Sequence, residues 1–429
     1  VNWASSAGDG VNPGNITAYS SYLTTTAAGN TAGNYLAASN VDVTSTPTLS
    51  GPVTVNSLRF GSAAANTLNL TGTNIISSGG LLVTSGVGAN TSAINGGTLA
   101  GSAGGDLCVI QHNTAAALTI GSQIVNNSSA TALVKIGAGI LTLNNSNTYT
   151  GGTYLGAGTL NVSQNNAIGT GALTFTSAAS LQAGGSGASL PNTINLGLFS
   201  NVFDTNGTTL TLNGDISNPS AVNNAIKANG SGTLDLAGNL NITGHATDTN
   251  NPALMMGNRN SANFNRGTVT VTGTGNISRI STGWDNTANV FNFASTGTVT
   301  MANDFVSGQS ANGVGVVNFT TGTLNLQNFN IANWDGAYGG FTMSGGTMNT
   351  TNLRNGGNGN GNGNSYSLMT GGTINVAEVT TLSRNGNGTN VLHLKGADAQ
   401  FNEGNNRFNV AFSAGSTGIV TVDNGLLTV

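Results

Sequence analysis

Aspartate residues, through their carboxylate groups, are the residues of this chain best suited to catalysis. Hydrolysis of a glycosidic bond needs two carboxyl groups about 5–10 Å apart. Candidates in the second half of the sequence are Asp215, Asp235, Asp285, Asp304 and Asp335. Each stands at a different offset from the glycine of its repeat unit, so these side chains should point to different faces. An enzyme resembling polysaccharide lyases or hydrolases is therefore the least favoured function, and we predict no catalytic residues.

Other chemically active side chains are sparse. His112, His245 and His393 lie far apart, without the spacing of metal ligands. Neither a nucleotide-binding glycine loop nor a serine nucleophile motif is present in the sequence. The single cysteine, Cys108, stands in an apolar run, which favours a buried structural residue over a reactive or intermolecular thiol. We therefore predict neither a cofactor nor a metal site.

One pair of short motifs suits binding better than catalysis. Trp284 and Trp334, each followed by an aspartate, are 50 residues apart, which is two repeat units. They should occupy the same turn of alternate coils, with Gln309 in the coil between them and the 355–364 loop on the same edge. Such Trp rings either stack on sugar rings or cover a corner of the core. The candidate ligand or partner contacts are Trp284, Asp285, Gln309, Trp334, Asp335, Arg354 and Arg384.

The composition limits the possible partners. Only 6% of the 429 residues are charged, 38% are hydrophobic, and glycine contributes 65. The ten Lys and Arg residues form no basic cluster, which argues against nucleic acid. No apolar run is long enough for a membrane-spanning helix. The scarcity of Cys and Lys is typical of a secreted protein.

A short phrase repeats along the chain: Gly-Thr followed by apolar, polar and apolar residues. It opens at Gly158, Gly232, Gly267, Gly297, Gly322, Gly346 and Gly372, with a variant at Gly418. Two further alternating runs accompany the phrase, so each unit of about 25 residues holds three short strands. Stacked units bury a common core. The buried side chains should include Leu160, Val162, Leu234, Leu236, Val269, Val271, Leu324, Leu326, Ile374 and Val376.

The polar residue of each phrase should form an outward column. Asn and Thr in such a column exchange side-chain hydrogen bonds, and the column keeps the exterior uncharged. The predicted column is Thr142, Asn161, Thr174, Asp235, Thr270, Thr300, Asn325, Asn349, Asn375 and Thr421. The fold class is thus all-β: a right-handed parallel β-helix, or β-solenoid, with three short strands per coil of about 25 residues.

The most regular stretch resembles a known repeat. Residues 133–143, 147–153 and 157–160 (LVKIGAGILTL, NTYTGGT and AGTL) are similar to the autotransporter-associated β-strand repeat of large bacterial surface proteins. The match covers residues 133–175, and the rest of the chain resembles the looser repeats of those proteins. The resemblance implies a right-handed parallel β-helix, export from the cell, a passenger or surface-fibre role, and no catalytic residues.

We divide the chain into an N-terminal cap or irregular first coils at 1–50 and a continuous solenoid at 51–429. Within the solenoid, 51–200 is rich in alanine and 201–429 is more regular. The predicted function is that of an extracellular, bacterial cell-surface structural or adhesive protein. A glycan-binding β-helix module is the alternative. The apolar end at 426–429 should be covered by further coils of a longer parent chain or by a second copy stacked head-to-tail in a fibre.

Overall fold

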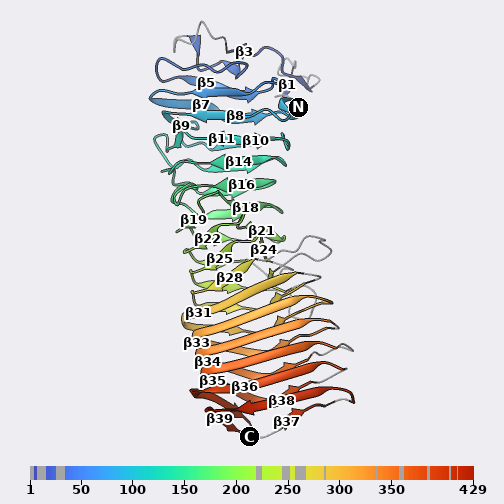
Figure 1. Cartoon of the computed structure of the whole chain (residues 1–429). Coiled ribbons are helices and arrows are strands. Elements are labelled where there is room, and N and C mark those ends of the chain that lie inside the picture. Colours follow the sequence, from blue (N-terminus) through green and yellow to red (C-terminus); the bar gives the residue numbers. More distant parts are fainter. Residues whose placement is uncertain are drawn as a thin grey trace. The chain divides into compact units, whose positions relative to one another are not determined.

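The computed structural model describes residues 4–6, 16–25, 34–218, 225–243, 252–256, 267–284, 287–334, 336–356, 362–383, 387–404, 407–412 and 414–429. The chain forms two compact units, residues 1–192 and 193–429. Within each unit, short strands stack in register as successive parallel coils (Figure 1). The described residues form no α-helix, and a 3-10 turn spans Ser85–Val87. The predicted parallel β-solenoid is confirmed.

Unit 1 contains three sheets, A1, B1 and C1, and a separate antiparallel pair, β1 (Ala4–Ser6) with β2 (Ile16–Ala18). Sheet A1 stacks β3 (Leu23–Thr24), β4 (Asn40–Asp42), β5 (Thr54–Phe60), β7 (Thr73–Val83), β10 (Leu107–Gln111), β13 (Leu133–Ile136), β15 (Thr153–Leu155) and β17 (Leu173–Phe175). Sheet B1 stacks β6 (Asn66–Asn69), β8 (Ser92–Asn95), β11 (Leu118–Ile120), β14 (Ile140–Leu143), β16 (Thr159–Val162) and β18 (Ser180–Ala183). Sheet C1 pairs the first halves of β5 and β7 with β9 (Thr98–Ala100) and β12 (Gln123–Ile124), and β19 spans Ala188–Leu190.

Unit 2 likewise contains three sheets, A2, B2 and C2. Sheet A2 begins with β20 (Ile194–Asn195), β23 (Ile216–Ser217), β26 (Leu240–Ile242) and β29 (Gly275–Ile277), and it ends with β39 (Leu426–Thr428). Sheet B2 stacks β21 (Asn201–Asp204), β24 (Ile226–Asn229), β27 (Leu254–Met256), β30 (Ile280–Thr282) and β32 (Asp304–Ser307), and it ends with β37 (Arg407–Val410). Sheet C2 stacks β22 (Thr209–Leu212), β25 (Thr233–Leu236) and β28 (Thr268–Val271), and it ends with β38 (Thr417–Val422).

Five long strands of unit 2 bend from sheet to sheet. They are β31 (Ala288–Met301), β33 (Val314–Ile331), β34 (Tyr338–Asn355), β35 (Asn364–Leu382) and β36 (Thr389–Glu403). Figure 1 shows them stacked in the yellow to red part of the chain. At the bend of β34, Gly346 has φ +77°, and a Cβ there would lie 2.6 Å from the Gly322 carbonyl oxygen. At this copy of the repeated phrase the glycine is therefore a corner residue that no other residue type can replace without strain.

The core forms as the period-two pattern predicts. All the side chains predicted to be buried are at most 6% exposed, the highest value being that of Leu326. In unit 2, Phe329 lies between Phe305 and Phe341, with ring centroids 5.4 and 5.1 Å away. These rings come from successive coils and from two sheets, so aromatic packing joins sheets B2 and C2 across the interior.

The repeated phrase occupies two sheets of unit 2, which corrects the predicted column. The copies at Gly232 and Gly267 lead into β25 and β28 of sheet C2, whereas those from Gly297 to Gly372 lead into sheet A2. Thr270 consequently pairs with Asn292 and not with the predicted Thr300. The 30-residue step between Gly267 and Gly297 is a change of sheet.

The column also differs from the prediction at two other places. Asn161 pairs with Gln182 in sheet B1, while Thr174 belongs to sheet A1. At the other end, Asn375 pairs with Asn402, while Thr421 belongs to sheet C2. The phrase fits either sheet equally well, so its sequence alone does not say which sheet it enters.

Side-chain amides do form outward ladders, on all three sheets of unit 2. The longest, on sheet A2, runs from Asn325 through Asn349 and Asn375 to Asn402, with N···O distances of 2.8, 2.8 and 2.9 Å. Shorter ladders join Asn292, Asn318 and Thr342 on sheet C2, and Asp304, Asn328 and Asn352 on sheet B2. On sheets A2 and C2 each amide is paired with the next coil without a charged partner, so these two faces need no charge to be polar.

Candidate functional site

The two Trp motifs occupy equivalent turns, between the end of sheet B2 and the start of sheet C2. The Trp284 carbonyl accepts a hydrogen bond from the Thr287 N–H at 2.8 Å, and the Trp334 carbonyl accepts one from the Ala337 N–H at 3.0 Å. In the coil between them, the Ser310 carbonyl accepts from the Gly313 N–H at 2.9 Å. The turn thus repeats once per coil, and the structure brings the two motifs to one edge.

The candidate contact residues differ in accessibility. Trp284 is only 2% exposed and Gln309 only 3%, whereas Trp334 is 49% exposed. Trp284 therefore covers the core at its corner, and Trp334 presents its ring to solvent. Asp285, Asp335 and Arg384 lie outside the described residues, as does much of the 355–364 loop.

Arg354 is the second-last residue of strand β34. It pairs with Asn330 of β33 and with Thr381 of β35, and its side chain is half-buried on the outer face of sheet B2. The strand continues to Asn355, the first residue of the predicted 355–364 loop, and β35 begins at its last residue, Asn364. Arg354 is therefore held by strand pairing on both sides.

The described candidate carboxylates lie on different sheets. Asp215 directly precedes β23 of sheet A2, and its carboxylate accepts a hydrogen bond from the Asn239 N–H. Asp235 lies on sheet C2, and Asp304 lies on sheet B2. Burial raises the pKa of Asp235, and a hydrogen bond from Thr272 at 3.0 Å acts against this. These three groups cannot converge on one glycosidic bond. No cluster of three or more His, Cys, Asp or Glu suited to a metal occurs among the residues with described positions.

Cys108 faces outward on β10 and is half-buried. Burial, together with the nearby Asp106, raises the pKa of its thiol, which favours the unreactive protonated form.

Sequence reasoning missed a polar cluster on sheet C2. The His393 Nε2 atom lies 2.8 Å from an Asp423 carboxylate oxygen, and its Nδ1 atom lies 3.1 Å from the Tyr366 hydroxyl. The three residues come from three successive coils, β35, β36 and the turn after β38. The stacking register that joins them is visible only once the coils are aligned.

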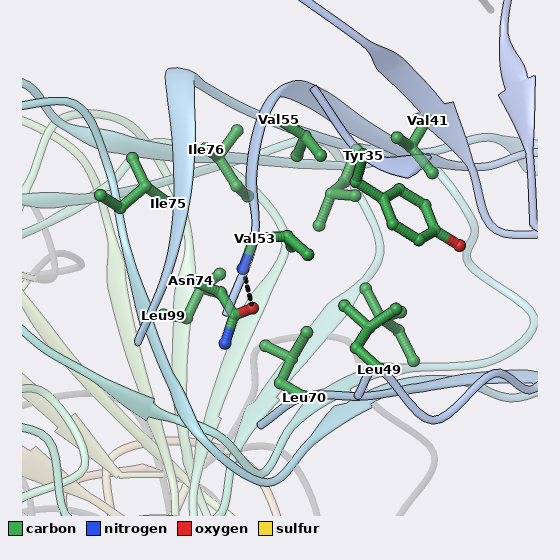
Figure 2. A pocket seen from close by; sticks show the side chains of 12 residues that line it. Tyr35, Val41, Leu49, Val53, Val55, Leu70, Asn74, Ile75, Ile76 and Leu99 are labelled. Carbon is green, nitrogen blue, oxygen red and sulfur yellow. Dashed lines mark hydrogen bonds between the residues drawn. The ribbon is translucent and has the colours of Figure 1, made fainter. Parts of the chain in front are cut away.

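Two hollows among the described residues differ in kind. Figure 2 shows the first, inside unit 1, where Tyr35, Leu49 and Val55 are among the apolar side chains around it. Asn74 accepts a hydrogen bond there from the Val53 N–H at 3.0 Å, also drawn in Figure 2. This cavity measures about 10 Å³, the space of a single water molecule, so it is a packing gap and not a ligand site.

The second hollow is an open groove of about 190 Å³ on the outer face of sheet B2. It crosses β34, β35 and β37, and Arg354 and Arg407 both line it. The remaining lining residues are Asn352, Val379, Thr381, Asn409 and Phe412. No helix in the part of the chain with described coordinates is both long and apolar enough to span a membrane.

Comparison with known protein families identifies one repeat within the stacked coils. Residues 133–162 match the passenger-associated-transport-repeat, within the stretch for which the resemblance was predicted. Repeat and fold together confirm the resemblance to bacterial surface proteins with an autotransporter passenger-type β-helix.

A particular relative is the adhesin BmaC autotransporter of Brucella suis biovar 1 (strain 1330). It is 38% identical over 102 residues, which is 24% of this chain and 3% of that protein. The chain therefore spans only a small part of the relative's length. No solved structure matches significantly.

Proposed function

We propose that this chain is part of an extracellular adhesive protein of the bacterial cell surface. The observation that carries the proposal is the passenger repeat at 133–162 lying within stacked parallel coils. A β-solenoid of this kind presents long, sparsely charged, hydrogen-bonded faces, which suits contact with a surface better than turnover of a substrate. A non-enzymatic role also agrees with the name of the Brucella relative.

A fibre-forming role is the finer proposal. Leu426 on β39 and Ile419 on β38 are 52% and 43% exposed, although both lie in strands of the stack. A second copy of the chain, stacked head-to-tail on this coil, would cover them and extend the stack. Intact mass and light scattering of native material would distinguish such a stack from a stable monomer.

Glycan binding is the second candidate, favoured by the exposed Trp334 ring. Beads coated with the purified chain should attach to some members of a panel of immobilised polysaccharides. Trp334→Ala should weaken that attachment about tenfold, because loss of an aromatic platform removes about 1–2 kcal/mol of contact. Tyr154→Ala, which removes a 40% exposed ring from unit 1, is the matched control and should have little effect. Unchanged attachment of the Trp334 variant would rule out this edge as the contact.

A further inference from the structure

We propose that the groove on sheet B2 binds an acidic polysaccharide, one whose sugars carry carboxylate or sulfate groups. The inference deepens the proposed adhesive function and rests on it. The groove differs from the rest of the exterior, where amide and hydroxyl ladders prevail, because two of the few cations of the chain border it.

Strand register brings the two guanidinium groups together. Asn352, Val379 and Arg407 stand in one outward column, and Arg354, Thr381 and Asn409 stand in the next. The arginines are therefore two coils apart and two residues apart along the strand. These steps separate their Cα atoms by about 12 Å, a distance that two long side chains can close toward a shared anion.

The chemistry of the lining selects for a charged sugar. A guanidinium group binds a carboxylate or a sulfate through two parallel hydrogen bonds. Asn409, which is partly exposed, supplies an amide that can pair with sugar hydroxyls, whereas Asn352 and Thr381 are buried. An added peptide strand is a poorer fit, because the groove lies on the face of the sheet, where β35 is already paired with β34 and β37.

The size of the groove also suits a polymer. It crosses three coils, so its length along the stack is about 10 Å, close to that of a disaccharide. Being open, it can admit part of a long chain without enclosing an end. Internal segments of a polysaccharide are therefore the expected occupant.

Binding of the purified chain to polygalacturonate, dextran sulfate and neutral dextran tests the proposal by titration calorimetry. One of the two charged polymers should bind, and which one does so separates carboxylate from sulfate recognition. Each of Arg354→Gln and Arg407→Gln should weaken that binding about tenfold, and the double variant about a hundredfold. Lys395→Gln removes an equal charge from an exposed position outside the groove and should change binding less than about twofold.

Three results would overturn the proposal: binding of neutral dextran as tightly as the charged polymers, wild-type affinity in the double variant, or an equal loss in Lys395→Gln. Arg407 is exposed, so its variant should keep the wild-type unfolding midpoint and remain informative if Arg354→Gln fails to fold. Failure of the groove is distinct from failure of the adhesive function. In the first case polymer binding is absent but coated beads still attach to other surfaces; in the second they attach to none.

Discussion

Gly158→Ala should destabilise unit 1 by about 4 kcal/mol or more, among the largest effects expected of any single substitution in this chain. Gly158 has φ +68°, and its new Cβ would lie 2.5 and 2.6 Å from the carbonyl oxygens of Gly137 and Gly139. Those atoms belong to the backbone of the preceding coil and cannot rotate away. The substitution must therefore spread two coils whose strands β14 and β16 are paired in register.

Two other glycines of unit 1 separate the causes of this loss. Gly88 has φ +65° and ψ −142°, a conformation that side chains other than glycine rarely adopt, and no atom lies within 4 Å of a new Cβ. Gly88→Ala should therefore show backbone strain alone, about 1–3 kcal/mol. Gly185 has neither a positive φ nor a close neighbour, so Gly185→Ala should be nearly neutral. Denaturant unfolding of the three variants measures the series. Equal losses for Gly158→Ala and Gly88→Ala would show that the coils do not approach as closely as described.

Lys135 should make the stability of unit 1 depend on pH. Its side chain is fully buried, and its Nζ donates to the carbonyl oxygens of Gly137 at 2.8 Å, Ala157 at 2.9 Å and Ile136 at 3.3 Å. Burial lowers the pKa of this amine from 10.5 to about 8. Between those values the unfolded chain binds more protons than the folded one, so stability should rise with pH across this window.

This lowering of the Lys135 pKa corresponds to a gain of about 3 kcal/mol in the free energy of unfolding between pH 8 and 10.5. Burial raises the pKa of Tyr149 and of Cys108, and these groups act in the opposite direction at alkaline pH. The measurement is therefore the difference in unfolding free energy between wild type and Lys135→Met, followed from pH 7 to 10.5. A difference that stays constant with pH would mean that the three carbonyl groups hold the ammonium form against burial.

The sequence predicts the coils because its pattern is local. Alternation of apolar and polar residues sets which side chains face the core, and Leu160 and Val376, far apart in the chain, are buried as that alternation requires. The assignment of a phrase to a sheet depends instead on how many residues each corner consumes. That number changes between Gly267 and Gly297, so the phrase alone placed Thr300 in the wrong column.

The exposure and grouping of exterior side chains were harder to predict, because they depend on contacts between coils. Trp284 and Trp334 occupy equivalent turns, yet only Trp334 is exposed, because exposure depends on what packs over each turn. The groove joins Arg354 to Arg407, which are 53 residues apart in the sequence and carry no shared motif. Once the coils are aligned, both arginines fall in neighbouring outward columns of sheet B2, and this alignment is the signal that could have found them.

Labelling of intact cells with antibodies against this chain tests the proposed surface role most directly, in the bacterium that encodes it. The account predicts that intact cells label as strongly as permeabilised cells. It also predicts that brief protease treatment of intact cells removes the label while a cytoplasmic control protein survives. Labelling that appears only after permeabilisation would place the chain inside the cell and contradict an adhesive surface function.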